Sequence, residues 1–375
     1  MWVADMDFSA PPVVLEALGS RLAHGVFGYP RVTDDVRDAV LLHLKRDLGW
    51  SVAPEWLVWL PGLVTGLNVC CRAVGESGDA VVTATPIYPP FMSAPKLSDR
   101  QLQTVPLTTA HDEWCWDLEA LAAATDARTR LLMLCNPHNP VGRVWRKDEL
   151  EALALMAERH DWIICSDDIH CELLLEPGVR YTPIATLSPE VARRTITLLA
   201  PSKTYNIPGL GAAFAVIPDA ALRRRFERVV AGIVPHINVL GYTAMAAAYR
   251  HGVPWRDAML DYLRGNRDHL VRSLNLLPGL QLQAPEATYL AWIDLRGLGI
   301  DTTERMDALL LLIRTSRIEG ADDGFRVVFD RVTRILVLTK AGYEQATVQI
   351  PLYHREADEE KLVNLRGATY NLAGG

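Results

Sequence analysis

The feature that most constrains the fold of this chain is a series of short apolar runs that alternate with helical patterns. Runs of strand length cover residues 57–60, 80–83, 131–135, 162–166, 195–200 and 212–217, and amphipathic helices are predicted over 63–74 and 147–160. Strands that alternate with helices are typical of a mostly parallel sheet covered on both faces. The sequence therefore predicts an α/β fold, in which ligands bind beyond the carboxyl ends of the strands.

The pattern becomes mainly helical beyond residue 218. We expect helices over 220–230, 240–251 and 255–277, a strand over 289–295 and a helix over 304–314, with weak periodicity from residue 320 onward. The 375 residues, 49% of them hydrophobic, are enough for two domains. We expect a large domain over residues 31–255 and a smaller α+β domain built from residues 1–30 and 256–375.

Charge and cysteine usage exclude several classes of function. The net charge is −7 and no basic block is present, which argues against nucleic acid as a partner. No apolar run is long enough to cross a bilayer, and Asp5 and Asp7 stand where a signal peptide would be basic. The six cysteines lack metal-ligand spacing, so we expect no metal site and free thiols in a reducing cytoplasm.

A lysine follows the buried strand that is predicted to end at Ala200. Lys203 stands in the stretch Pro201-Ser202-Lys203-Thr204-Tyr205-Asn206. A lysine there is often a solvated loop residue, but a desolvated amine can lose its proton and form a Schiff base with an aldehyde. Other polar residues at strand ends favour this second interpretation.

Two ionisable residues follow the preceding strand. Asp167 either caps a helix or faces a ring nitrogen, which its charge would keep protonated so that the ring becomes an electron sink. His170 either orients such a ring or Asp167, or is an ordinary core histidine.

Three further stretches complete the predicted site. Gly62, Leu63 and Val64 open a helix, whose free amides can bind phosphate, although Pro-Gly before a helix is common. Asn139 lies in a turn that fixes its amide, which can donate to a phenolate oxygen. Tyr88 either stacks on a flat ring or is an ordinary turn residue. Together these residues call for a negatively charged aromatic cofactor joined to Lys203.

Seven stretches resemble one enzyme family in order and spacing from residue 1 to about 296. They are MWVADMDFSAPP (1–12), HGVFGYP (24–30), LPGLVTGLN (60–68), TPIYPPF (85–91), LCNPHNPVGRVW (134–145), CSDDIHCEL (165–173) and APSKTYNIPGL (200–210). The chain resembles fold type I pyridoxal-phosphate enzymes of the class I/II aminotransferase superfamily, and within them the MalY/PatB-type cystathionine β-lyases, which are C–S lyases. The resemblance implies a three-layer sandwich, pyridoxal 5'-phosphate as cofactor and a homodimer.

The resemblance also implies a role for each matching residue. Lys203 is similar to the lysine that forms the internal aldimine and later moves the proton. Asp167 resembles the partner of the ring nitrogen. The other matching positions are Asn139 at the ring hydroxyl and substrate carboxylate, Tyr88 stacked on the ring, Leu63, Val64 and Ser202 at the phosphate, and Tyr29 at the phosphate of the neighbouring subunit.

Two departures from the family pattern stand out. Many aminotransferases of this fold have an arginine eight residues after the lysine, where this chain has Gly211, which favours the lyase branch. The family has an arginine that binds the substrate carboxylate, and the stretch around it is only weakly similar to residues 324–329 here. Arg326 is the best candidate for this arginine, followed by Arg331 and Arg334. Residues 330–375 do not resemble the family.

The resulting hypothesis is a β-elimination on an S-substituted L-cysteine such as cystathionine, which releases a thiol, pyruvate and ammonia. Two alternatives remain open at this stage. One is an amino-acid aminotransferase. The other is a catalytically weak regulatory homologue that binds a protein partner.

Overall fold

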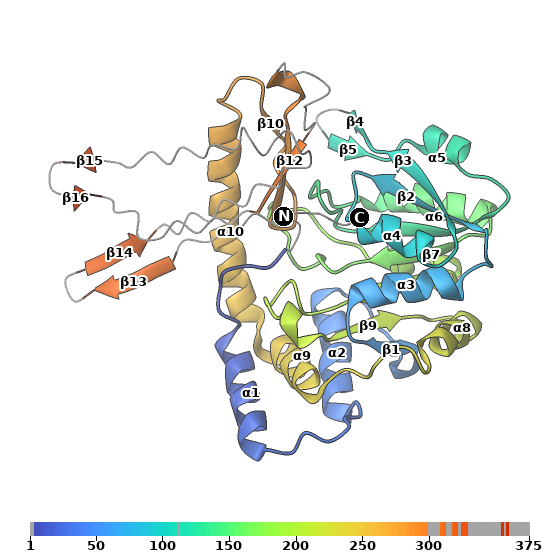
Figure 1. Ribbon diagram of the computed structural model, residues 1–375, viewed down its shortest axis with the longest axis horizontal. Helices are drawn as coiled ribbons and strands as arrows, with labels where there is room; N and C mark the ends of the chain where they lie inside the picture. Colours follow the sequence, from blue (N-terminus) through green and yellow to red (C-terminus); the bar gives the residue numbers. More distant parts are fainter. Residues whose placement is uncertain are drawn as a thin grey trace, which may run out of the picture.

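The computed structural model is centred on a seven-stranded sheet with strand order β1-β9-β8-β7-β6-β2-β3 (Figure 1). Its strands are β1 (Leu57–Leu60), β2 (Ala80–Thr85), β3 (Gln101–Pro106), β6 (Thr129–Cys135), β7 (Ile163–Asp167), β8 (Thr195–Leu199) and β9 (Ala213–Val216). The five strands from β8 to β3 in this order pair in parallel, and β9 runs antiparallel to both of its neighbours. The mostly parallel sheet agrees with the sequence prediction.

The structure describes residues 4–110 and 113–298, together with the backbone of five later strands. These strands are β12 (Ala308–Leu312), β13 (Arg317–Ala321), β14 (Gly324–Val328), β15 (His354–Arg355) and β16 (Asp358–Glu359). β13 pairs with β14, and β15 pairs with β16. Of the sequence predictions, the roles of Arg331 and Arg334 lie outside the described residues.

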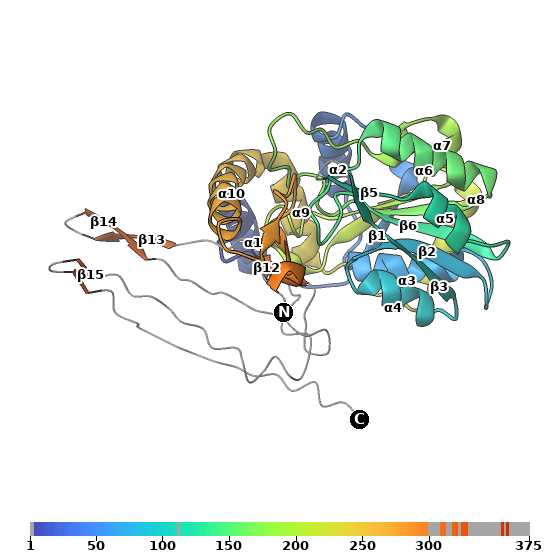
Figure 2. The same cartoon turned by 90° about the horizontal axis from the view of Figure 1, so that it is seen from above.

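Helices cover both faces of the central sheet, as the view from above shows (Figure 2). One face carries α3 (Leu63–Ala73), α4 (Pro90–Lys96) and α8 (Ala220–Val230). The other carries α5 (Leu118–Ala124), α6 (Lys147–Arg159) and α7 (Pro189–Arg193). The strands β1, β8 and β9 also pack against α2 (Asp34–Asp47) and α9 (Val239–His251). The molecule therefore has three layers.

Strand β6 shows why the central strands read as unbroken apolar runs. Leu131 and Met133 point into the core beneath α3, whereas Leu132 and Leu134 point into the core beneath α6. Successive side chains of a strand face opposite sides, so a strand covered on both faces needs apolar residues at every position.

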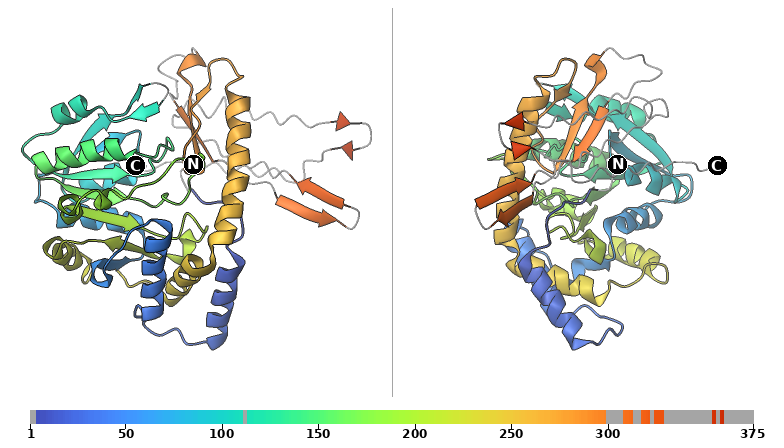
Figure 3. Two further views of the ribbon diagram at one scale, coloured as in Figure 1. Left: turned by 180° about the vertical axis from the view of Figure 1, so that it is seen from behind. Right: turned by 60° about the vertical axis from the view of Figure 1, so that its left-hand side comes forward.

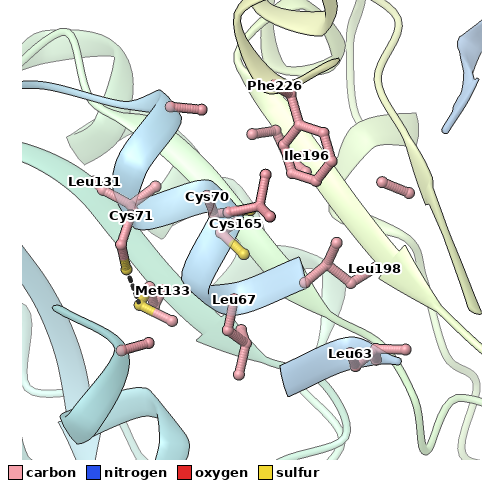
Figure 4. Packing of buried hydrophobic residues seen from close by; sticks show 14 of the residues in the cluster. Leu63, Leu67, Cys70, Cys71, Leu131, Met133, Cys165, Ile196, Leu198 and Phe226 are labelled. Atoms are coloured by element: carbon pink, nitrogen blue, oxygen red, sulfur yellow. Dashed lines mark hydrogen bonds between the residues drawn. The ribbon is translucent and has the colours of Figure 1, made fainter. Parts of the chain in front are cut away.

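Helix α3 lies close to the sheet at a glycine. A Cβ at Gly66 would come within 3.0 Å of both terminal methyl groups of Leu198 in β8. Around this contact, Leu63 and Leu67 of α3 pack with Ile196 and Leu198 in one apolar cluster (Figure 4). The absence of a side chain at residue 66 therefore sets the distance between α3 and the sheet.

A second, smaller sheet lies beside the long helix α10 (Val253–Leu274), with α1 (Pro12–His24) at the end of that helix (Figure 3). Its strands are β10 (Gln281–Leu282), β11 (Leu290–Asp294) and β12, which pair antiparallel. The helix predicted over 304–314 is wrong where β12 forms. Its run of leucines is a short apolar run, and periodicity alone cannot distinguish a strand from a buried helix in such a run.

The remaining short elements are a hairpin and four 3-10 turns. The hairpin joins β4 (Thr108–Ala110) to β5 (Glu113–Cys115). The 3-10 turns are η1 (Pro54–Trp56), η2 (Ile184–Thr186), η3 (Pro208–Leu210) and η4 (Arg296–Leu298). Among the described residues, no helix is both long and apolar enough to cross a membrane. All six cysteines are free thiols, and every one except Cys115 is buried.

We expect Gly66→Val to lower the free energy of unfolding by about 1–3 kcal/mol, because the added methyl groups would overpack the contact with Leu198. Urea unfolding of the cofactor-free protein measures this change. Gly265→Val in α10 is the matched control, because a Cβ there would meet nothing within 4 Å. Equal stabilities of the two variants would show that α3 does not depend on this close contact.

Candidate active site

The predicted site residues follow strands that end at one edge of the central sheet. In the register of the parallel strands, Cys135 pairs with Asp167 and Asp167 pairs with Leu198. The chain continues from this row to Asn139 after β6 and to Lys203 after β8, while Asp167 itself closes β7. Neighbouring parallel strands thus bring together residues that lie up to about 70 positions apart in the sequence.

Asp167 is a buried carboxylate with few donors around it. Its Oδ1 accepts a hydrogen bond from the amide of Ile169 at 3.2 Å, and the residue is 4% exposed. Burial raises the pKa of Asp167 to about 7, because the positive charge of Lys203 and the Ile169 amide offset the loss of solvation only in part. The neighbouring Asp168 turns away to accept from the hydroxyls of Ser166 and Tyr181.

Lys203 is partly buried, and its charge interacts with that of Asp167. Burial lowers the pKa of the Lys203 amine, although the charges of Asp5 and Asp167 oppose this shift. The amino group donates a hydrogen bond to the carbonyl of Ala4. Lys203 therefore has the environment that makes an amine more nucleophilic near neutral pH.

Three other predicted residues surround this pair. His170 is buried, its Nδ1 has no hydrogen-bond partner within the described part of the chain, and burial next to Lys203 lowers its pKa to about 3. Burial and the charge of Asp167 raise the pKa of Tyr88. The amide of Tyr88 donates to the carbonyl of Asn139 at 3.1 Å, so these two turns are tied together.

The amino end of α3 points its first amides away from any capping side chain. Gly62 is the N-cap of this helix and makes no side-chain cap, and Val64 is 44% exposed. Free amides at a helix N-terminus, with the helix dipole behind them, bind phosphate. Ser202, the fourth predicted phosphate ligand, stands next to Lys203 and is partly buried.

The glycine at the position of the family's arginine has a structural cause. Gly211 has φ +56°, in the left-handed region that favours glycine, and a Cβ there would lie 3.2 Å from the carbonyl of Pro61. An arginine at residue 211 would strain this turn.

The roles of two further residues, Tyr29 and Arg326, stay predictions. Tyr29 is fully exposed in the segment between α1 and α2. Its neighbours Val26 and Phe27 are each more than half exposed. The backbone of Arg326 lies in β14, opposite Glu319, and its side chain lies outside the described residues.

Sequence reasoning missed an arginine that braces the Asn139 turn. The guanidinium of Arg143 is 4% exposed and pairs with Glu286 at 2.7 Å and with Glu149 at 3.0 Å. Glu286 also accepts from the amide of Val144 at 2.7 Å. Arg143 thus fastens the turn after β6 to the segment that leads into β11. Arg143 lies in the stretch LCNPHNPVGRVW (134–145), but its role was not apparent because its partner Glu286 lies 143 residues away.

Tyr289 and Asn206 were also missed. The Tyr289 hydroxyl donates to the carbonyl of Ala4 at 3.1 Å, and its ring meets His170 edge to face at 6.1 Å. Asn206 binds the backbone of Met6 and Phe8. Asn206 lies in the stretch APSKTYNIPGL (200–210), three residues after Lys203, and this position could have indicated its role. No local sequence pattern indicated a role for Tyr289.

The arrangement fits a phosphorylated aromatic aldehyde. A buried Asp167 with a raised pKa calls for a cationic donor, such as a protonated ring nitrogen. The Asn139 side-chain amide makes no hydrogen bond to the described residues and is free for a ring oxygen. The amine of Lys203 and the amides of α3 supply the remaining contacts.

Comparisons with known proteins support this assembly. The sequence profile of the aminotransferase class I and II family matches residues 3–339. The chain is 37% identical over 313 residues to cystathionine β-lyase PatB of Bacillus subtilis (strain 168), covering 83% of this chain and 81% of PatB. These matches confirm the family resemblance seen in the sequence.

Solved structures agree in fold. The crystal structure of OvoB has 49% sequence identity and a TM-score of 0.79, covering 80% of this chain and 79% of that one. Cystalysin from Treponema denticola, whose crystal structure contains a pyridoxal 5'-phosphate cofactor, has 32% identity and a TM-score of 0.77, with coverage of 80% and 77%. The predicted three-layer α/β fold is confirmed.

We expect Asp167→Asn to stabilise the cofactor-free protein increasingly as the pH rises. The folded-state pKa of about 7 lies above the usual aspartate value of 3.8, so the stability that the protonated acid contributes is lost as the pH rises through 7. The free energy of unfolding of the variant minus that of wild type should increase by up to about 4 kcal/mol from about pH 4 to about pH 8.

Chemical unfolding at both pH values checks this expectation. Asp168 and the buried histidines titrate in both proteins, so the comparison cancels their contributions to first order. A difference that stays constant with pH would contradict the raised pKa of Asp167.

Proposed function

This chain belongs to the aminotransferase class I and II family, and we propose that it is a pyridoxal-phosphate-dependent carbon–sulfur β-lyase. Its substrate is cystathionine or another S-substituted L-cysteine, and its products are a thiol, pyruvate and ammonia. The observation that carries this proposal is the buried Asp167, whose charge interacts with the partly buried Lys203, in a chain 37% identical to a cystathionine β-lyase. Gly211, in place of a phosphate-binding arginine, also favours a lyase over a transaminase.

Pyridoxal 5'-phosphate, when bound, supplies an aldehyde for an amine and a ring that accepts electrons from the substrate Cα. Lys203 supplies the protein's amine. When it is not joined to the cofactor, Lys203 would be the base that takes the proton from the substrate Cα, which its lowered pKa allows near neutral pH. It can return that proton later as a general acid.

Asp167 keeps a proton on the ring nitrogen, because a carboxylate without water around it is stabilised by a cationic donor. His170 stays neutral at physiological pH, since burial and Lys203 lower its pKa to about 3. It can therefore accept or donate one hydrogen bond beside the ring without adding charge.

We also propose which residues hold the rest of the cofactor. We assign the phosphate to the amides of Leu63 and Val64 after Gly62, together with Ser202. Tyr88 stacks on the ring, and Asn139 donates to the ring oxygen and the substrate carboxylate. Arg326 remains our proposal for the second ligand of that carboxylate.

The reaction releases sulfur from Cβ. After Lys203 has removed the Cα proton, the bond from Cβ to sulfur breaks and the electron pair leaves with sulfur, which takes up a proton. Water then releases the remaining three-carbon fragment as pyruvate and ammonia. For cystathionine, one water molecule is consumed and the thiol is homocysteine.

We further propose that the protein acts in the cytoplasm as a homodimer with two domains per subunit, one of residues 31–255 and one of residues 1–30 and 256–375. The segment around Tyr29 supports the dimer, because Leu22, Val26 and Phe27 are each more than half exposed beside a fully exposed tyrosine. In a dimer, Tyr29 would reach the phosphate of the neighbouring site.

The cofactor-loaded protein should release pyruvate from cystathionine, and Lys203→Ala should lower that rate about a thousandfold or more because the base is lost. Borohydride followed by peptide mass spectrometry should fix the cofactor on Lys203. The matched control is Lys147→Ala, an exposed lysine of α6 that pairs with Glu151. Transfer of the amino group to a 2-oxo acid without pyruvate would instead identify an aminotransferase.

Mixing two inactive variants tests the dimer. If Tyr29 completes the partner's site, a heterodimer of Lys203→Ala and Tyr29→Ala contains one wild-type site. Random exchange of subunits should then restore about a quarter of the wild-type sites. If Tyr29 acts within its own subunit, or if the protein is a monomer, the mixture should show no more activity than the average of the separate variants.

A further inference from the structure

The segment that precedes α1 lies against the loop that follows β8, and one side chain holds the two together. Asn206 Oδ1 accepts a hydrogen bond from the Met6 amide at 3.0 Å. Its Nδ2 donates to the carbonyl of Met6 at 2.9 Å and to that of Phe8 at 2.7 Å. One amide group thus binds the backbone at three points, so the contact does not depend on which side chains the segment carries.

Asn206 is itself fixed relative to Lys203. Its φ of 52° lies in the left-handed region, which asparagine tolerates better than most residues. On either side of it, the amide of Tyr205 donates to the Pro201 carbonyl at 3.0 Å and the amide of Ile207 donates to the Ser202 carbonyl at 2.9 Å. The turn that presents Lys203 therefore also presents the Asn206 amide in a set direction.

The segment that Asn206 holds supplies an acceptor to the lysine. The Ala4 carbonyl accepts from Lys203 Nζ and from the hydroxyl of Tyr289, the latter at 3.1 Å. Ala4 and Met6 are buried, and the charge of Asp5 acts on Lys203. A buried amine without an acceptor is costly, so this carbonyl gives the side chain of Lys203 one preferred position.

We propose that Asn206 is a positioning residue that fixes the segment of residues 4–8, so that the Ala4 carbonyl holds the amino group of Lys203 at the wall of the site whenever no cofactor is joined to it. The proposal rests on the proposed function, because it gives Lys203 a defined place while the substrate occupies the cofactor. The amine then stays beside the site, where it can act as a base.

The test uses cofactor-free protein and the variant Asn206→Gly. Glycine keeps the left-handed backbone and removes all three side-chain hydrogen bonds. We expect hydrogen exchange of the amides of residues 4–8, and acetylation of Lys203 by acetic anhydride, to become about tenfold faster or more. Both are measured by peptide mass spectrometry.

Asp161→Gly is the matched control, because Asp161 also has a left-handed φ of 54° but carries an exposed side chain after α6. Neither rate should change in this control. Acetylation of the exposed Lys147 should be equal in all the proteins, and so should exchange within α6. If exchange in α6 rises as well, Asn206→Asp replaces the glycine variant, since aspartate tolerates the same backbone and loses both donors.

Unchanged exchange of residues 4–8, or faster exchange with unchanged acetylation of Lys203, would overturn the proposal. Neither measurement needs cofactor or turnover. A protein that lacked lyase activity but showed both changes would refute the proposed function and leave the role of Asn206 in place.

Discussion

The parallel pairing of β6, β7 and β8 is the constraint on which the site depends. Its register places Cys135, Asp167 and Leu198 in one row at the end of the sheet. Because both faces of these strands are covered by helices, the last residue of β7 has almost no access to water. The same packing that stabilises the sheet therefore raises the pKa of Asp167 to about 7. A cationic partner next to Asp167 would stabilise its ionised form.

Backbone amides form part of the proposed cofactor-binding site. Gly66 lets α3 approach Leu198 closely. Because α3 follows β1, which runs in the same direction as β8, the free amides at its start lie at the same edge of the sheet as Lys203. The turn at Gly211 packs against the Pro61 carbonyl, one residue before the N-cap of α3. A side chain there would disturb the start of α3, which we propose binds phosphate, and this gives a physical reason for a proposed phosphate site made of amides.

Much of this arrangement was predictable, because local patterns encode it. Buried parallel strands read as unbroken apolar runs, and the polar residues at their ends stand at fixed distances from them, as Asp167 and Lys203 do. Contacts across long separations were not predictable. Arg143 pairs with Glu286, and Tyr289 donates to the carbonyl of Ala4, but no periodicity in the sequence indicates either contact. The leucines of β12 were misread as a helix because their partners lie in β11, not in the neighbouring turns.

Residues 4–8 form their contacts with residues that are synthesised much later. Residues 4–8 leave the ribosome well before their partners, because Asn206 lies about 200 positions later and Tyr289 lies 285 positions after Ala4. Strands β6 to β8 can pair in a nascent chain before that point, since domains generally fold as units during synthesis. The contacts around Lys203 cannot be complete until translation has passed Tyr289, so a partly synthesised chain can have the sheet without the complete candidate site.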